Sequence, residues 1–229
     1  MSAQVINKRL SNLRRSMKRV AGLFGNRLVD LNVNPFATHL PILVGLARLF
    51  EIRTVLEIGC GQYSTLTLLN RNAFPDLLSL HSFENDLDWS QKIAEMTGRD
   101  SRFKLEFVNQ PMGMAVTNMP AEDYDLVFVD DSQTYQERAE TIRKVADKFS
   151  AAKLVVIHDS EVPLYQSAAS KFRNRFTFTA LNPNTDLVWN NIPVNRTLLK
   201  DLNTTITRHS QSLNSDDLDG WITLFANGS

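Results

Sequence analysis

Short apolar runs alternate with amphipathic segments through the middle of this chain. The runs are rich in valine, isoleucine, leucine and phenylalanine, and the segments between them repeat apolar residues every three or four positions. The first pattern predicts buried strands and the second predicts helices with one apolar face. Their alternation is typical of a parallel sheet with crossover helices. The expected strands are Thr54–Ile58, Leu78–Phe83, Phe103–Val108, Asp125–Val129 and Leu154–Ile157. The expected helices cover residues 38–50, 64–72, 88–97, 134–149 and 162–173.

Two further apolar runs, Phe176–Leu181 and Thr185–Trp189, end this pattern. Only Asn182, Pro183 and Asn184 separate them, and so short a connection cannot carry a crossover between parallel strands. The two runs must therefore pair antiparallel. The sequence thus predicts an α/β fold with a seven-stranded, mostly parallel sheet, helices on both faces and a C-terminal antiparallel hairpin.

The two ends of the chain differ from the middle. Residues 1–30 repeat apolar positions at helical spacing between lysines and arginines, and no acid occurs before residue 30. They predict a basic amphipathic helix that packs on the domain or on a second subunit, with contact to a membrane surface or a polyanion as the alternative. Residues 31–190 are expected to form the main domain, and residues 191–229 a polar C-terminal extension.

Charge and cysteine content exclude several classes of protein. Lysine plus arginine and aspartate plus glutamate both number 25, so no overall field would recruit nucleic acid. The single cysteine, Cys60, excludes an intrachain disulfide and a zinc site built from cysteines. No apolar run approaches the roughly 20 residues that span a bilayer. The expected location is the cytoplasm, and we leave open whether the chain forms a homo-oligomer.

Acidic residues stand at or next to the ends of four predicted strands. Glu57, Glu84 and Asp130 mark three of these ends, and Asp159 follows His158 at the fourth. The carboxyl ends of parallel strands share one edge of the sheet, where ligands bind in open α/β folds. This edge is therefore the expected functional site.

The first of these acids precedes a glycine turn. Gly59 and Gly61 follow Glu57 and would let a ligand approach the main chain, while Ser64 or Thr65 can cap the next helix. Glu84 lies 23 residues beyond Gly61, near the spacing at which an acid accepts the hydroxyls of a ribose. A pyrophosphate turn would carry a third glycine, and a carboxylate there would repel phosphate but suit an ammonium or sulfonium. The turn favours S-adenosylmethionine over a dinucleotide.

With these motifs the sequence resembles the class I S-adenosylmethionine-dependent methyltransferases. The resemblance rests on Val55–Gly61, Phe83-Glu84, Asp125–Asp131 and the terminal hairpin, and covers roughly residues 38–190. It implies a Rossmann-like fold whose seventh strand is antiparallel, with S-adenosylmethionine as cofactor.

A narrower similarity is to the small-molecule and sugar O-methyltransferases. Tyr135 after the fourth strand and His158-Asp159 after the fifth match their pattern, whereas Asp131-Ser132-Gln133 replaces its glycine, aspartate and histidine. The acceptor implied by this similarity is a hydroxyl of a small molecule or sugar.

The resemblance also implies roles for individual residues. The implied cofactor contacts are Glu57, Gly59, Gly61 and Ser64 on the methionine side, Glu84 on the ribose, Asn85 and Gln110 near the adenine, and Asp130 at the methionine end. The implied catalytic residues are His158 as the base that takes the acceptor's proton, with Asp159 and Asp130 beside it.

A divalent cation such as Mg²⁺ could be held by Asp130, Asp131 and Asp159, since hard cations take carboxylate oxygens. The alternative is that Asp130 orients the cofactor or substrate and Asp131 caps the helix that begins near Thr134. The remaining histidines, His39, His81 and His209, are interpreted as packing or surface groups.

Two other functions stay open beside O-methylation. One is a nucleotide-binding oxidoreductase of the NAD type, and the other is a non-catalytic S-adenosylmethionine-binding or assembly protein, since Asp131-Ser132-Gln133 departs from the relatives' pattern. Methylation of nucleic-acid amino groups is not expected, because no Asn/Asp-Pro-Pro-aromatic motif follows the fourth predicted strand. The acceptor itself is not identified.

Overall fold

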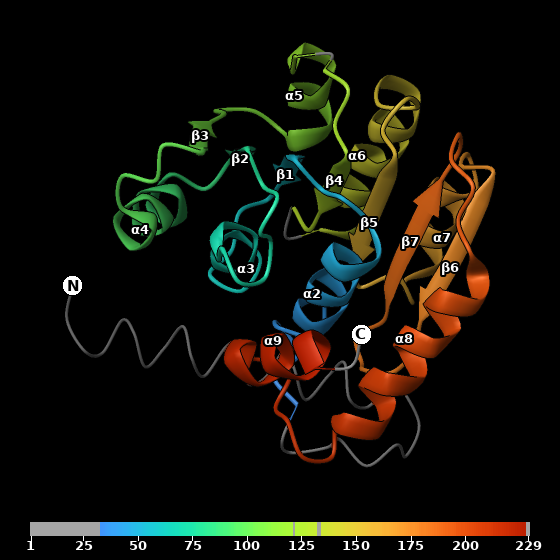
Figure 1. The fold of residues 1–229 in the computed structure, drawn as a ribbon. Coiled ribbons are helices and arrows are strands. Elements are labelled where there is room, and N and C mark those ends of the chain that lie inside the picture. The colour runs from blue at the N-terminus through green and yellow to red at the C-terminus, as the bar shows by residue number, and fades with distance from the viewer. Residues whose placement is uncertain (1–32, 121, 132–133, 228–229) are drawn as a thin grey trace, which may run out of the picture. The chain divides into compact units, whose positions relative to one another are not determined.

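A single seven-stranded sheet organises the part of the chain that the computed structural model describes, residues 33–120, 122–131 and 134–227 (Figure 1). The predicted basic helix over residues 1–30 lies outside the described residues, as do Ser132 and Gln133. The strands are β1 (Thr54–Ile58), β2 (Ser79–Glu84), β3 (Phe103–Phe107), β4 (Leu126–Val129), β5 (Leu154–His158), β6 (Asn174–Phe178) and β7 (Thr185–Trp189).

The strand order in the sheet is β3-β2-β1-β4-β5-β7-β6. Strands β1 to β5 pair parallel, whereas β7 runs antiparallel to both β5 and β6. The predicted fold class, including the terminal hairpin, is therefore confirmed. The strand order reverses at β1. Strands β2 and β3 lie on one side of it, and β4, β5, β7 and β6 lie on the other. Ligands bind at such a reversal in open α/β sheets.

The helices occupy both faces of the sheet. They are α2 (Leu40–Leu49), α3 (Thr65–Leu69), α4 (Leu87–Thr97), α5 (Met112–Asn118), α6 (Tyr135–Lys148), α7 (Pro163–Ala169), α8 (Arg196–His209) and α9 (Leu218–Asn227). Five of them fall within or close to the predicted ranges, whereas α5, α8 and α9 were not predicted as helices.

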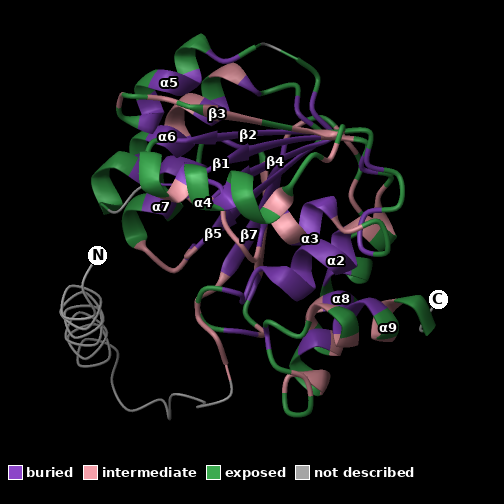
Figure 2. Cartoon of the chain, turned by 90° about the vertical axis from the view of Figure 1, so that its left-hand side faces the viewer, coloured by how far each residue is buried: buried purple, intermediate pink, exposed green. Residues whose placement is uncertain are grey.

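Side chains alternate along the strands and feed two apolar cores. On β4, Leu126 and Phe128 join a core with α2, α3, α8 and α9, while Val127 and Val129 join a second core with α5, α6 and α7. Figure 2 shows the central strands buried while the outer sides of the helices are exposed. A sheet covered on both faces explains why its strands are continuous apolar runs in the sequence.

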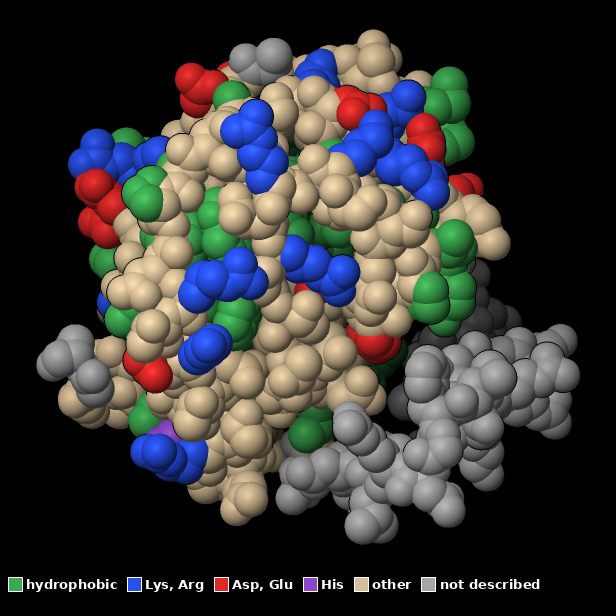
Figure 3. Space-filling view, turned by 90° about the vertical axis from the view of Figure 1, so that its right-hand side faces the viewer, with side chains coloured by type: hydrophobic (Ala, Val, Ile, Leu, Met, Phe, Trp, Pro, Cys, Tyr) green, Lys and Arg blue, Asp and Glu red, His purple; other side chains and the backbone are tan. Residues whose placement is uncertain are grey.

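The last two helices, α8 and α9, contact α2 and share its core. Leu199, Ile206 and Trp221 are fully buried there, so this polar-looking region contributes apolar anchors to the domain. No helix in the described ranges is long and apolar enough to cross a membrane. On the face seen in Figure 3, basic side chains are distributed widely and acidic ones lie beside several of them.

Candidate functional site

The register of the sheet brings the strand-end residues into one row. Ile58 of β1 is level with Phe83 of β2 and Val129 of β4, and Val129 is level with Ile157 of β5. The residues that follow these four are Gly59, Glu84, Asp130 and His158. The sequence-predicted edge is thus assembled at the carboxyl ends of four neighbouring parallel strands.

Gly59 lies in the turn after β1, against the backbone that follows β4. Its φ of 84° falls in the left-handed region that favours glycine. A Cβ atom there would lie 2.5 Å from the Asp130 carbonyl oxygen and 2.6 Å from Asp131 Cα. Because those atoms belong to the backbone, only glycine lets the turn after β1 pack against the end of β4.

Glu84 ties the turn after β1 to the turn after β2. Its Oε1 accepts the backbone N–H groups of Asn85 and Asp86 at 2.7 and 2.8 Å, and its Oε2 accepts the N–H of Cys60 at 3.2 Å. The Cys60 thiol is a further, weak donor at 3.6 Å. Burial raises the pKa of Glu84, although these N–H groups oppose the effect. The carboxylate is therefore fixed in position between the two turns.

Glu57 lies beneath the turn, fully buried, and not on its surface. Its Oε2 accepts hydroxyl hydrogen bonds from Thr65 at 2.8 Å and from Ser82 at 2.5 Å. The same Thr65 hydroxyl accepts the backbone N–H of Gly61 at 3.0 Å. Burial raises the pKa of Glu57 to about 7. Glu57 thus reaches the glycine turn through Thr65, which the sequence indicated only as a candidate helix cap.

The other cofactor-side residues surround this turn. Ser64 is buried and its hydroxyl lies 3.5 Å from the Gly61 carbonyl oxygen, while Asn85 is exposed and Gln110 is half-buried after β3. The Trp89 indole donates to the Cys60 carbonyl oxygen at 2.6 Å, so it packs on the turn. Burial also raises the pKa of the Cys60 thiol, which stays protonated and unreactive at neutral pH.

A second cluster forms where β4 and β5 end. The Nδ1 atom of His158 lies 3.2 Å from Asp130 Oδ2, and its Nε2 lies 2.9 Å from the Thr38 hydroxyl. His158 and Thr38 are almost fully buried, whereas the Asp130 side chain is 23% exposed. Burial alone would lower the pKa of His158, but the carboxylates of Asp130 and Asp159 outweigh it and raise the pKa.

Arg138 of α6 links the predicted carboxylates. Its Nη1 lies 2.9 Å from Asp130 Oδ1 and 2.9 Å from Asp159 Oδ2. Burial would raise the pKa of Asp130, but the charges of His158 and Arg138 lower it instead. Asp159 itself has a left-handed backbone, with φ 56°. The cation between these two carboxylates is therefore a guanidinium that the chain supplies.

Asp131, the third member of the predicted metal set, faces the interior. Its Oδ2 accepts the Thr141 hydroxyl of α6 at 2.7 Å, and burial raises the pKa of this carboxyl to about 6. The structure thus brings Asp130 and Asp159 together and places Asp131 away from them. The N-cap interaction of α6 is made by Thr134, whose hydroxyl accepts the Glu137 N–H, so the predicted capping role of Asp131 is wrong.

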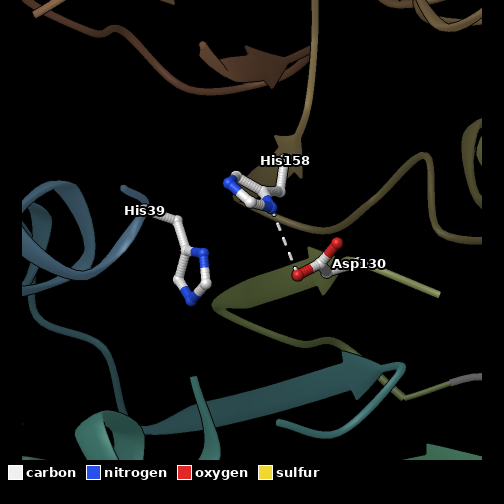
Figure 4. A group of neighbouring side chains, drawn as sticks. All are labelled: His39, Asp130 and His158. Carbon is white, nitrogen blue, oxygen red and sulfur yellow. Dashed lines mark hydrogen bonds and ion pairs between the residues drawn. The ribbon is translucent and has the colours of Figure 1, made fainter. Parts of the chain in front are cut away.

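His39 completes the cluster from the start of α2. Its ring lies 4.6 Å from that of His158 and 5.0 Å from that of Phe128, measured between centroids. Neither ring nitrogen has a hydrogen-bond partner among the described residues. Burial and the neighbouring His158 lower the pKa of His39 to about 3, so the ring is neutral. Figure 4 shows the ring beside His158 and Asp130.

Sequence reasoning missed the contributions of Thr38, His39, Thr65 and Arg138. The sequence does contain an indication for Arg138, because this residue falls on the apolar side of the predicted helix, where Ala139, Thr141 and Ile142 are buried. A cation on such a face indicates a buried anionic partner. The two residues before α2 carry no comparable local signal.

Comparison with solved structures finds this fold among methyltransferases. The chain is similar to human methyltransferase-like protein 13 in complex with SAH, with a TM-score of 0.52 and 16% identity over 77% of this chain and 93% of that one. It is also similar to SAH-bound Podospora anserina methyltransferase PaMTH1, at a TM-score of 0.48 and 15% identity over 66% and 77% of the two chains.

A further similarity is to an O-methyltransferase family protein from Burkholderia thailandensis, at a TM-score of 0.46 and 14% identity over 67% of this chain. The present chain spans 57% of the length of that protein. No protein-family model and no curated protein matches the sequence. The fold is that of the class I methyltransferases.

Proposed function

We propose that this protein is an S-adenosylmethionine-dependent methyltransferase. The observation that carries the proposal is the Glu84 carboxylate, fixed by N–H groups of two neighbouring turns at the point where the strand order reverses. This is where a nucleoside binds in open α/β folds, and an acid there suits the ribose hydroxyls. The SAH-bound human protein that shares the fold supports the same cofactor.

The residues of the turn fit such a cofactor. Among the four donors to Glu84, the Cys60 thiol is the weakest, so a ribose hydroxyl can take its place on Oε2. Asn85 and Gln110 would border the adenine, and Gly59, Gly61 and Ser64 the methionine side. Glu57 would act on this side through Thr65, because it has no exposed surface. The bound sulfonium supplies an electrophilic methyl group.

We further propose that the acceptor is a hydroxyl of a small molecule or sugar, and that His158 takes its proton. Asp130 at Nδ1 would set the tautomer whose Nε2 acts as the base, and Asp159 would support the imidazolium formed. Nε2 now faces the Thr38 hydroxyl, so the acceptor must replace that contact. Arg138 holds both carboxylates in place.

Calorimetry with S-adenosylmethionine, SAH and NAD tests the cofactor. Both sulfur compounds should bind to the wild type, whereas Glu84→Gln should weaken binding about tenfold or more, as expected when a charged acceptor is lost. Glu106→Gln, a change on the neighbouring β3, should leave the affinity unchanged. Binding of NAD without binding of either sulfur compound would overturn the assignment.

Transfer of labelled methyl groups to a panel of hydroxylated metabolites and sugars tests the reaction. His158→Gln should abolish transfer while cofactor binding persists, because the proposed base acts only on the acceptor. Cofactor binding with no transfer to any acceptor would instead favour the non-catalytic alternative.

A further inference from the structure

His39 is a buried polar side chain beside His158 and Asp130. The residue is 2% exposed, and both ring nitrogens lack hydrogen-bond partners in the described part of the chain. It lies at the N-cap of α2 but makes no capping hydrogen bond with its side chain. An imidazole in this position leaves an N–H donor and a lone pair unsatisfied, which costs free energy unless a ligand satisfies them.

The groups next to His39 are themselves ligands for metals. One donor atom each from His39, Asp130 and His158 lies within 4.8 Å of the other two. Figure 4 shows a ring nitrogen of His39 turned toward the space between His158 and Asp130. The three residues come from the start of α2 and the ends of β4 and β5, so rigid elements hold them together.

The spacing between His158 and Asp130 suits a shared ion. Nδ1 and Oδ2 are 3.2 Å apart, which is longer than the roughly 2.7–2.9 Å of a charge-assisted hydrogen bond. Two ligands that each lie about 2.0–2.1 Å from a tetrahedral Zn²⁺ are about 3.3 Å apart. Only His39 must then shift to complete the set.

The outer contacts of a metal site are already present. Ligating histidines donate their other ring N–H to an oxygen, and here Nε2 of His158 faces the Thr38 hydroxyl at 2.9 Å. Ligating carboxylates are also held by hydrogen bonds, and Arg138 holds Oδ1 of Asp130 at 2.9 Å. Both contacts leave Nδ1 and Oδ2 directed at each other.

We propose that His39, His158 and Asp130 bind a transition-metal dication of the Zn²⁺ type. Two imidazoles and one carboxylate are borderline donors that suit such ions better than Mg²⁺. The ion would take the place of the proton between Nδ1 and Oδ2, and that proton would leave to solvent. Three protein ligands leave a fourth position open, as in catalytic zinc sites.

This site differs from one built on Asp130, Asp131 and Asp159. The carboxylates of Asp130 and Asp159 already share Arg138, and Asp131 Oδ2 accepts the hydrogen bond of the Thr141 hydroxyl. Metal binding by His39, His158 and Asp130 also does not require that the protein transfer methyl groups. A metal on Nδ1 keeps the proton on Nε2, so metal binding and the base role of His158 are alternative states.

Titration of the metal-free full-length chain with ZnCl₂ tests the site without cofactor or acceptor. We expect one Zn²⁺ per chain by calorimetry, and visible absorption bands of low-coordinate Co²⁺ when CoCl₂ is used instead. His39→Phe should weaken Zn²⁺ binding more than about a hundredfold, the upper cost of losing an outer contact. This variant should fold, because an apolar ring fills the same space beside Phe128.

Two further variants make the test decisive. Thr38→Val removes the outer contact of His158 and should weaken binding about tenfold to a hundredfold. His81→Gln alters the other buried histidine, which pairs with Glu106 on β3, and should leave binding unchanged. Failure of the wild type to bind Zn²⁺, or equal binding by wild type, His39→Phe and Thr38→Val, would overturn the proposal.

Discussion

Replacing Glu57 with glutamine should make the protein more stable at neutral pH. The wild-type carboxyl is fully buried beneath the glycine turn, and burial raises its pKa from 4.5 to about 7. Between these two values the folded protein keeps a proton that the unfolded chain has released. Stability linked to this proton is fully present below about pH 4.5 and is lost as the pH rises to about 7.

The size of the effect follows from the two pKa values. They differ by about 2.5, and each pH unit is worth about 1.4 kcal/mol, so ionisation of Glu57 costs the fold on the order of 3 kcal/mol. Glutamine has the shape of the protonated acid and can still bond the hydroxyls of Thr65 and Ser82. It does not titrate, so the variant avoids this loss.

Urea denaturation at a series of pH values measures the difference. The free energy of unfolding of Glu57→Gln, minus that of the wild type, should rise by roughly 3 kcal/mol from about pH 4.5 to about pH 7.5. Asp131, whose pKa is also raised, titrates in both proteins and cancels in this difference. Glu95→Gln, on the exposed side of α4, is the control and should show no trend. A difference that stays constant with pH would refute the argument.

Other predictions follow from the same edge of the sheet. Gly59→Ala should lower the free energy of unfolding, measured in urea, by at least about 2 kcal/mol, because it combines a left-handed backbone with a clash against Asp130. Gly61→Ala should cost under about 1 kcal/mol, because its Cβ would meet only the Ser64 hydroxyl. Equal costs would contradict the close approach of β1 and β4. Adding the cofactor should change tryptophan fluorescence mainly through Trp89, since Trp189 and Trp221 are buried elsewhere. Trp89→Phe should therefore remove most of the change. A change that persists in this variant would place the cofactor away from the turn. The rate of methyl transfer should fall as the pH drops through a midpoint above 6.5, because the pKa of His158 is raised. Asp130→Asn removes a carboxylate that raises this pKa and should move the midpoint to lower pH. Initial rates that give the same midpoint for both proteins would argue against His158 as the base.

Most of the sheet could be predicted because its signals are local. Apolar runs predicted the strands. The predicted run Phe176–Leu181 is displaced, because β6 covers Asn174–Phe178, but the connection to β7 over residues 179–184 is still too short for a crossover. Helix α5 was missed because it is short and contains Gly113, a poor helix former. A Cβ there would lie 3.2 Å from Glu140 and 3.3 Å from Thr141, so the glycine serves the contact of α5 with α6.

The site was predictable only in part, because some of its contacts are not local in the sequence. Acids at strand ends could be assigned to one edge because parallel strands share their direction. The burial of Glu57 and the arrival of Arg138 at Asp130 depend on packing between distant elements, and so does the position of His39 beside His158. Sequence position therefore indicated which edge carries the chemistry but not which groups neutralise its charges.

The left-handed backbone of Asp159 makes this edge a point of competition between stability and charge arrangement. A non-glycine residue in that conformation costs on the order of 1–3 kcal/mol when the surroundings hold it there. Glycine would relieve the cost but would also remove the carboxylate that anchors Arg138. The strained backbone and the ion pair with Arg138 therefore come together in one residue, and a substitution that relieves the strain also takes a carboxylate away from a buried guanidinium.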